Sequence, residues 1–274
     1  MKLVIFWVML LLLVLPAWTQ TPNIVDGGVL NGASFALGQQ VAPGSLVSIF
    51  GNNLASLLAL ASSIPLSNSL GNVSVTFNGI PAPMMAAIPG SATSAAQLNV
   101  QVPYGVLPAG TTSGPATVVV TVGDTSSAAQ TVQIGSAAPG IFSTQYGVGV
   151  AIAVNNDGTL AAAANSVPGF SSHPAKIGDP FGLLILATGL GAVDPPAVDG
   201  HDSLDTLRWA QIPTVLVGGL PAKVLFAGAS PQFPGVNQLN IVLPAGVAAG
   251  DAVPLQIQAG GITSTDKVTI AISQ

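Results

Sequence analysis

The charged residues that could do chemistry gather in one short segment, residues 194–211. Within it lie four aspartates, one histidine and one arginine: Asp194, Asp199, His201, Asp202, Asp205 and Arg208. Carboxylate oxygens are the ligands that Ca²⁺ prefers, so Asp199, Asp202 and Asp205 are candidate calcium ligands. The spacing fits no established calcium loop. The alternative is a solvated loop whose aspartates start turns and cap a short helical turn over residues 203–209.

The same segment carries the main aromatic candidate for ligand contact. Sugar faces stack on exposed rings, and Trp209, next to Arg208, is the one tryptophan that follows the amino-terminal twenty residues. We therefore name Trp209 and Arg208 as candidate ligand contacts, with an extracellular glycan as the ligand. The alternative is that Trp209 folds back onto the protein.

Candidates for catalysis are few. The chain has two histidines, His173 and His201, and contains neither cysteine nor glutamate. It has no G-x-S-x-G elbow, Walker loop, H-E-x-x-H motif or EF-hand spacing. A serine hydrolase would need one of the two histidines as its base, and neither is tied to a particular serine by sequence. We name no catalytic residue and no cofactor, and hydrolase activity ranks third among the functions considered.

Composition narrows the class of protein. The 274 residues are 49% hydrophobic, and five Lys and Arg against ten Asp give a formal net charge of −5. Nucleic-acid partners are disfavoured, because phosphate neutralisation needs clustered basic residues. The 32 glycines and 22 prolines are many for a helical protein. The length is enough for one large domain or two ordinary ones.

The amino-terminal residues have the layout of a secretory signal peptide. Lys2 precedes an apolar run over residues 3–15, and Ala17 and Thr19 suit the small positions before a cleavage site. The run is shorter than the roughly 20 residues that a membrane span needs. We expect residues 1–19 to be cleaved, no transmembrane segment to follow, and the protein to be exported to the periplasm, cell surface or medium.

The remaining sequence contains an internal repeat. Residues 77–82 (FNGIPA) return as 217–222 (VGGLPA), and residues 97–103 (QLNVQVP) return as 238–244 (QLNIVLP). Segments 46–54 and 183–190 also resemble one another, so the matches keep their order. Ordered matches of this kind indicate two copies of one unit. We expect tandem domains over residues 20–136 and 137–274.

Within each copy, apolar and polar residues alternate with a period of two. Val73, Val75 and Phe77 alternate with Ser74 and Thr76. This pattern is typical of antiparallel strands with one face exposed to water. Turn pairs punctuate the strands, namely Asn78-Gly79, Gly123-Asp124, Gly218-Gly219 and Gly260-Gly261. The fold class expected is all-β, two immunoglobulin-like sandwiches, with a hairpin over residues 148–164 and a polar insert loop over 194–211 in the second copy.

These segments carry a family resemblance. The stretches 31–35 (NGASF), 41–45 (VAPGS), 138–142 (APGIF), 156–159 (NDGT), 187–191 (ATGLG) and 238–244 resemble the uncharacterised domain recurrent in secreted Solibacter-type acidobacterial proteins. That domain is similar to IPT/TIG immunoglobulin-like folds. The resemblance implies a secreted or surface β-sandwich module and supplies no catalytic motif.

Charge is nearly absent from the first copy. Between Gln20 and Val150 only Asp26 and Asp124 are charged. Edge strands are usually protected from pairing with other chains by charges, proline or bulges. A surface with so little charge therefore favours packing against neighbouring molecules. We therefore expect a non-catalytic interaction or structural module whose partner is an envelope protein or a second copy. The alternative is a glycan- or calcium-dependent adhesion module that uses residues 194–209.

Overall fold

The computed structural model describes residues 20–274, and the expected signal peptide, residues 1–19, lies outside the described residues. Strands joined by turns and loops make up the described chain, which contains no helix. The all-β fold class is thereby confirmed. Residues 20–274 accordingly contain no helix of the length and hydropathy needed to cross a membrane.

The amino-terminal half forms a sandwich of two sheets. The five-stranded sheet has the order β1 (Asn23–Asn31), β2 (Leu46–Asn52), β8 (Ala96–Gln101), β7 (Met84–Ile88) and β3 (Ala59–Leu60). The six-stranded sheet has the order β10 (Thr125–Ser126), β9 (Gly114–Val122), β5 (Val73–Phe77) and β4 (Ser69–Leu70), with β11 (Gln130–Ile134) paired to β9 and β6 (Ile80–Pro81) to β5.

The carboxy-terminal half forms a second sandwich. Its nine-stranded sheet has the order β16 (Ser172–His173), β15 (Leu160–Ala161), β14 (Ala153–Val154), β18 (Leu183–Thr188), β24 (Asn237–Val242), β23 (Lys223–Ala229), β20 (Trp209–Ala210) and β19 (Val193–Asp194), with β12 (Gly140–Ile141) paired to β18. Its seven-stranded sheet has the order β13 (Val148–Val150), β27 (Lys267–Ser273), β25 (Gly250–Ala259), β21 (Thr214–Val217) and β22 (Leu220–Pro221), with β17 (Ala175–Lys176) paired to β27 and β26 (Ile262–Thr263) to β25.

The two sandwiches share one pairing scheme. The order β2-β8-β7 in the first corresponds to β18-β24-β23 in the second, and β9-β5-β6 corresponds to β25-β21-β22. Even an irregularity recurs, because the register shifts between Met84 and Ala86 in β7 and between Val224 and Phe226 in β23. The repeat read from the sequence is therefore a repeat of structure.

The turn pairs act as the sequence predicts. Asn78 and Gly79 both have positive φ angles, 50° and 79°, and they join β5 to β6. Gly218-Gly219 and Gly260-Gly261 have the same pattern between β21 and β22 and between β25 and β26. Two consecutive residues with positive φ make the tight turn whose twist suits a hairpin.

Each sandwich has its own hydrophobic core. In the first, Val73, Val75 and Phe77 are fully buried, and the alternating Ser74 and Thr76 are partly exposed on the other face of β5. In the second, Val215 and Val217 of β21 occupy the corresponding positions. The apolar residues of the two halves fall into separate clusters, so each half buries a core of its own.

Two local expectations need correction. The hairpin is narrower than residues 148–164, because β14 pairs with β15 through Val154 and Leu160, whereas β13 pairs in parallel with β27. The helical turn over 203–209 is wrong. Residues 204–206 form bends, and Trp209 pairs with Asp194 and Gly228 as part of β20. Those strand pairings hold the backbone extended at the position where a helical turn would end.

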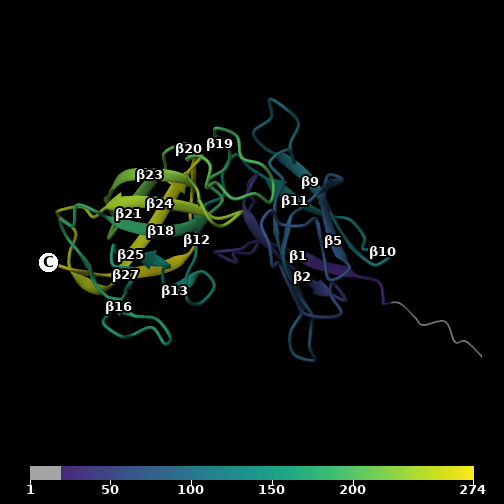
Figure 1. The fold of residues 1–274 in the computed structure, drawn as a ribbon, viewed down its shortest axis with the longest axis horizontal. Helices are drawn as coiled ribbons and strands as arrows, with labels where there is room; N and C mark the ends of the chain where they lie inside the picture. The colour runs from purple at the N-terminus through teal and green to yellow at the C-terminus, as the bar shows by residue number, and fades with distance from the viewer. Residues whose placement is uncertain (1–19) are drawn as a thin grey trace, which may run out of the picture.

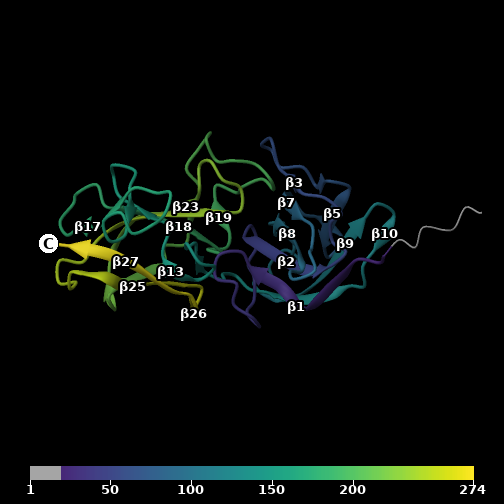
Figure 2. The ribbon, with the colours of Figure 1, turned by 90° about the horizontal axis from the view of Figure 1, so that it is seen from below.

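The two sandwiches lie end to end along the long axis of the molecule (Figure 1). The insert between β19 and β20 lies at the junction between them, as the view from below also shows (Figure 2).

Candidate functional site

The insert loop reaches from the second sandwich onto the first. The carboxylate Oδ1 of Asp199 accepts a hydrogen bond from the backbone N–H of Tyr104 at 2.9 Å. The next residue, Gly200, donates its N–H to Oε1 of Gln101 at 2.7 Å and accepts from the N–H of Leu66 at 2.8 Å. Three bonds from two consecutive residues therefore fasten the loop to β8, to the residues that follow β8, and to the segment between β3 and β4. We call this contact the junction clasp.

Local structure and charge explain why the clasp needs these residue types. Gly200 has a φ of +75°, and a Cβ there would lie 3.0 Å from the carbonyl oxygen of Leu66, so a side chain would be strained. Burial raises the pKa of Asp199, and the bond from the Tyr104 N–H partly offsets that rise. Burial, with the nearby charge of Asp199, raises the pKa of the Tyr104 hydroxyl to about 12.

A second set of contacts joins the sandwiches beside the clasp. Thr188 is fully buried; its hydroxyl donates to the carbonyl of Gly235 at 2.6 Å and accepts from the N–H of Leu46 at 2.8 Å. The buried Asn31 of β1 donates to the carbonyl of Ala138 at 2.8 Å. Because buried polar groups are costly when unpaired, these bonds bind the two sandwiches in one relative position.

The three candidate calcium ligands make different contacts in the structure. Asp199 belongs to the clasp, and Asp205 forms a two-point ion pair with Arg208, at 2.6 and 3.0 Å. Asp202 makes no side-chain hydrogen bond within the described residues. Across residues 20–274, no three acidic or histidine side chains gather in a group that could hold a metal ion. The calcium hypothesis remains a prediction, without a ligand cluster to support it.

Arg208 and Trp209 both pack against their own sandwich. The Arg208 guanidinium donates to Asp205 and to the carbonyl of Pro196. The hydrogen bonds between the two side chains raise the pKa of Arg208 and lower the pKa of Asp205. The Trp209 ring meets the ring of Phe226 edge-on, with centroids 4.8 Å apart, and remains 40% exposed. The Trp209 ring is therefore partly exposed and available for contact with a ligand. The Arg208 guanidinium is occupied by its bonds to Asp205 and Pro196 within the loop.

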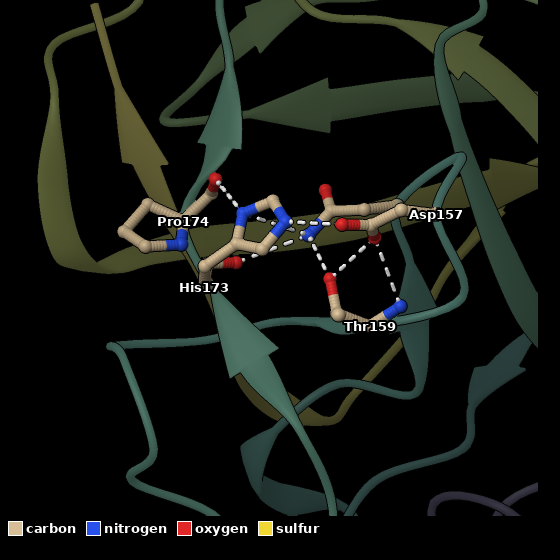
Figure 3. A network of polar contacts seen from close by, with 5 residues as sticks. Asp157, Thr159, His173 and Pro174 are labelled. Carbon is tan, nitrogen blue, oxygen red and sulfur yellow. Dashed lines mark hydrogen bonds and ion pairs between the residues drawn. The ribbon is translucent and has the colours of Figure 1, made fainter.

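One histidine belongs to a polar network (Figure 3). Nε2 of His173 lies 2.8 Å from Oδ2 of Asp157, and its Nδ1 lies 2.9 Å from the carbonyl of Pro174. The Thr159 hydroxyl donates to the other oxygen of Asp157 at 2.7 Å. The two acceptors around the ring raise the pKa of His173, and the bonds from Thr159 and His173 lower the pKa of Asp157 to about 2.

The geometry of this network bears on catalysis. A general base needs one ring nitrogen free to accept a proton from the nucleophile. Both nitrogens of His173 face acceptors, an arrangement that suits the doubly protonated ring. The network connects the turn between β14 and β15 to β16, so it holds that turn in place. His201 lies exposed in the insert loop and makes no side-chain hydrogen bond within residues 20–274.

Asp266 is the most buried of the acidic residues described. Asp266 lies in the segment that joins β26 to β27, and the residue is 6% exposed. Its Oδ2 accepts the N–H of Ile141 at 3.0 Å, but its Oδ1 is buried with no hydrogen-bond partner in the described structure. Burial raises the pKa of Asp266 to about 6. The residue ties the start of the second sandwich to its last strand, and it does so with one oxygen unsatisfied.

Sequence reasoning missed several residues of the junction. Gln101, Thr188 and Asn31 are ordinary polar residues in strands, and nothing in their local sequence distinguishes a contact across the junction from a solvated position. The sequence does contain one indication of these junction contacts. Gln101 corresponds to Val242 in the second copy and Tyr104 corresponds to Ala245, so the two copies differ at the positions that meet the clasp.

Comparison with known proteins supports the fold. Residues 38–135 match the IPT/TIG domain family. No curated protein matches the chain. Among solved structures, domains 5–6 of the S-layer protein SbsC share 11% identity over 92% of this chain and 98% of that chain, with a TM-score of 0.26.

Two further solved structures show the same low level of similarity. The plexin A4 extracellular region shares 10% identity over 93% of this chain and has a TM-score of 0.25; this chain spans 18% of its length. The titin I9–I11 tandem shares 11% identity over 93% of this chain and 67% of that chain, with a TM-score of 0.21. Scores of this size carry no weight in the assignment. The first sandwich thus matches the IPT/TIG family, and the chain has an all-β, immunoglobulin-like fold.

Proposed function

We propose that this protein is an exported, non-catalytic interaction module in which the insert loop holds two immunoglobulin-like sandwiches as one rigid unit. The junction clasp carries the proposal. The insert lies between β19 and β20, in the connection that holds β3 and β4 in the first copy, and its Asp199 and Gly200 bond to the neighbouring sandwich. A loop built to bind a soluble ligand would keep those groups free.

Other features support the same role. Both nitrogens of His173 are engaged by acceptors, so the described histidine network offers no free base. The neutral first sandwich suits contact with other proteins. The export part of the proposal rests on the layout of residues 1–19, and amino-terminal sequencing of the secreted protein would test it by showing Gln20 as the first residue.

The clasp is tested by calorimetry on Asp199→Ala. In the unchanged protein we expect the two sandwiches to unfold in one coupled transition. Loss of the Asp199 carboxylate leaves the part-buried Tyr104 N–H without its partner, and an unpaired buried donor costs about 1–3 kcal/mol at most. We expect the coupled transition to weaken by that amount and to separate into two.

Asp202→Ala is the matched control, because Asp202 lies in the same loop and makes no side-chain hydrogen bond within the described residues. It should leave the coupled transition unchanged. Two independent transitions in the unchanged protein, insensitive to Asp199→Ala, would contradict the proposal of a rigid unit.

A further inference from the structure

The two sandwiches differ beside the last strand of each copy, β11 in the first and β27 in the second. In the second copy, β13 lies parallel to the start of β27, with Val150 opposite Thr269 (Figure 2). The carbonyl of Thr269 accepts from the N–H of Ala151 at 2.9 Å. The N–H of Lys267 donates to the carbonyl of Gly147 at 2.8 Å. The segment around β13 therefore covers the outer edge of β27.

The strand pairing shows which part of β11 corresponds to this covered edge. Phe77 and Val217 are corresponding residues of the internal repeat. Across β9, the pairing that starts at Phe77 reaches Gln130, the residue before Thr131. Across β25, the pairing that starts at Val217 reaches the residue before Thr269. Thr131 of β11 therefore corresponds to Thr269 of β27.

The first copy has no strand in the position of β13. In the second copy, β12 and β14 both pair with β18, and residues 142–152, which contain β13, connect them. In the first copy, β1 pairs with β2 on both sides of a bulge of residues 25–28. Four extended residues span at most about 14 Å, too short to leave β2, follow β11 and return. Within the described residues, the outer edge of β11 is paired with backbone only at its end, where Val41 forms a bridge with Ile134.

A cleft of about 190 Å³ lies at this uncovered part of β11. It is lined by uncharged residues of three segments, namely 27–29 of β1, 38–40, and 130–133 of β11. The carbonyl of Gln133 accepts from the N–H of Val41, on the edge of β11 that faces away from β9. Because backbone groups alternate in direction along a strand, the N–H and C=O of Thr131 point to the same edge, toward the cleft.

We infer that this cleft binds an extended segment of another protein, which adds to β11 in parallel as β13 adds to β27. The strand that fills the corresponding position in the second copy, Val148–Val150, indicates the chemistry of the segment: it is uncharged and has glycine at its centre. Gly149 has a φ of +78°, a conformation that favours glycine. In strand addition, backbone hydrogen bonds supply affinity and alternate side chains supply specificity. The inference rests on the proposed interaction role and names the surface and the kind of partner.

A synthetic peptide of residues 144–152 (TQYGVGVAI) tests the inference when it is titrated into the processed protein and followed by NMR. We expect the amide signals of Gly28 and Thr131 to shift, and hydrogen exchange of the Thr131 amide to slow at least about tenfold. Thr269 is the internal control, because β13 already covers it, and its amide should not change. The same peptide with proline in place of Gly149 is the matched control; it lacks the central N–H and should not bind.

Thr131→Pro tests the same contact from the protein's side. Its N–H faces the cleft rather than β9, and edge strands accept proline at such positions, so we expect the variant to fold and to lose peptide binding. No shift of the Thr131 amide at about 1 mM peptide, or equal binding of the proline-containing peptide, would overturn the inference.

Slow exchange of the Thr131 amide without peptide would also overturn the inference, because the cleft would then already be covered by the chain itself or by a second copy. The clasp is measured by unfolding within one molecule. A protein that binds no peptide but unfolds in one coupled transition would therefore leave the proposed rigid unit standing.

Discussion

Because the Asp266 carboxyl is buried, we expect it to make the free energy of unfolding depend on pH, and we expect Asp266→Asn to remove that part of the dependence. The carboxyl is buried, accepts one backbone N–H from Ile141, and has a second oxygen with no partner in the described structure. Its pKa is about 6 in the folded protein, against an ordinary value of 3.8. We therefore expect the ionised form to be the unfavourable one in the folded state.

The difference between the pKa of Asp266 in the folded and unfolded states sets the sign and the size of this pH dependence. Below about pH 4 both the folded and unfolded states hold the proton, so the burial carries no ionisation penalty. Between about pH 4 and pH 6 the folded state holds a proton that the unfolded state has lost, so the free energy of unfolding falls as pH rises. A difference of about two pKa units corresponds to about 3 kcal/mol, and the loss is complete above about pH 7.

The assay is urea unfolding of the unchanged protein and of Asp266→Asn at intervals from pH 4 to pH 8. The asparagine keeps an oxygen to accept from Ile141 but does not titrate. The difference in unfolding free energy between the two proteins cancels the other titrating groups and should change by about 3 kcal/mol across this range. Asp251→Asn, which changes an exposed acid on β25, is the control. A difference between the unchanged protein and Asp266→Asn that stays constant from pH 4 to pH 7 would refute the reasoning.

Two other substitutions test individual contacts. Thr188→Val keeps the shape of the side chain but removes the hydroxyl that accepts from Leu46 across the junction and donates to Gly235 of its own sandwich, so we expect about 1–3 kcal/mol of destabilisation by urea unfolding, with Thr188→Ser recovering part of it. Asp157→Asn removes the negative charge of the group that accepts from His173 Nε2, so the pKa of His173 measured by NMR should fall toward its ordinary value. The pair of Asp157 and His173 should contribute to the free energy of unfolding between the lowered pKa of Asp157 and the raised pKa of His173, and this contribution should be lost above and below that range. An unchanged His173 pKa in Asp157→Asn would show that the pair does not form in solution.

The sequence alone determined the fold class and the repeat. Alternation such as that of residues 73–77 fixes which face of a strand is buried, because side chains on a strand point to opposite faces in turn. Turn pairs such as Asn78-Gly79 fix where strands reverse, since few residues adopt positive φ at low cost. Both are local properties, so they can be read from neighbouring residues without knowledge of the rest of the chain.

The tertiary structure decided what the insert loop does. Its aspartates looked alike in sequence, yet Asp199 grips the first sandwich, Asp205 pairs with Arg208, and Asp202 has no side-chain partner within the described residues. The same holds for Asp266, which follows β26 in sequence but accepts its hydrogen bond from Ile141 of β12, 125 positions away. Contacts between residues about one hundred positions apart, such as Asp199 with Tyr104, depend on how two complete sandwiches meet. No local sequence pattern predicts this contact between the two sandwiches. The contact depends on the shapes and polar groups of two surfaces, and these surfaces exist only after each half has folded.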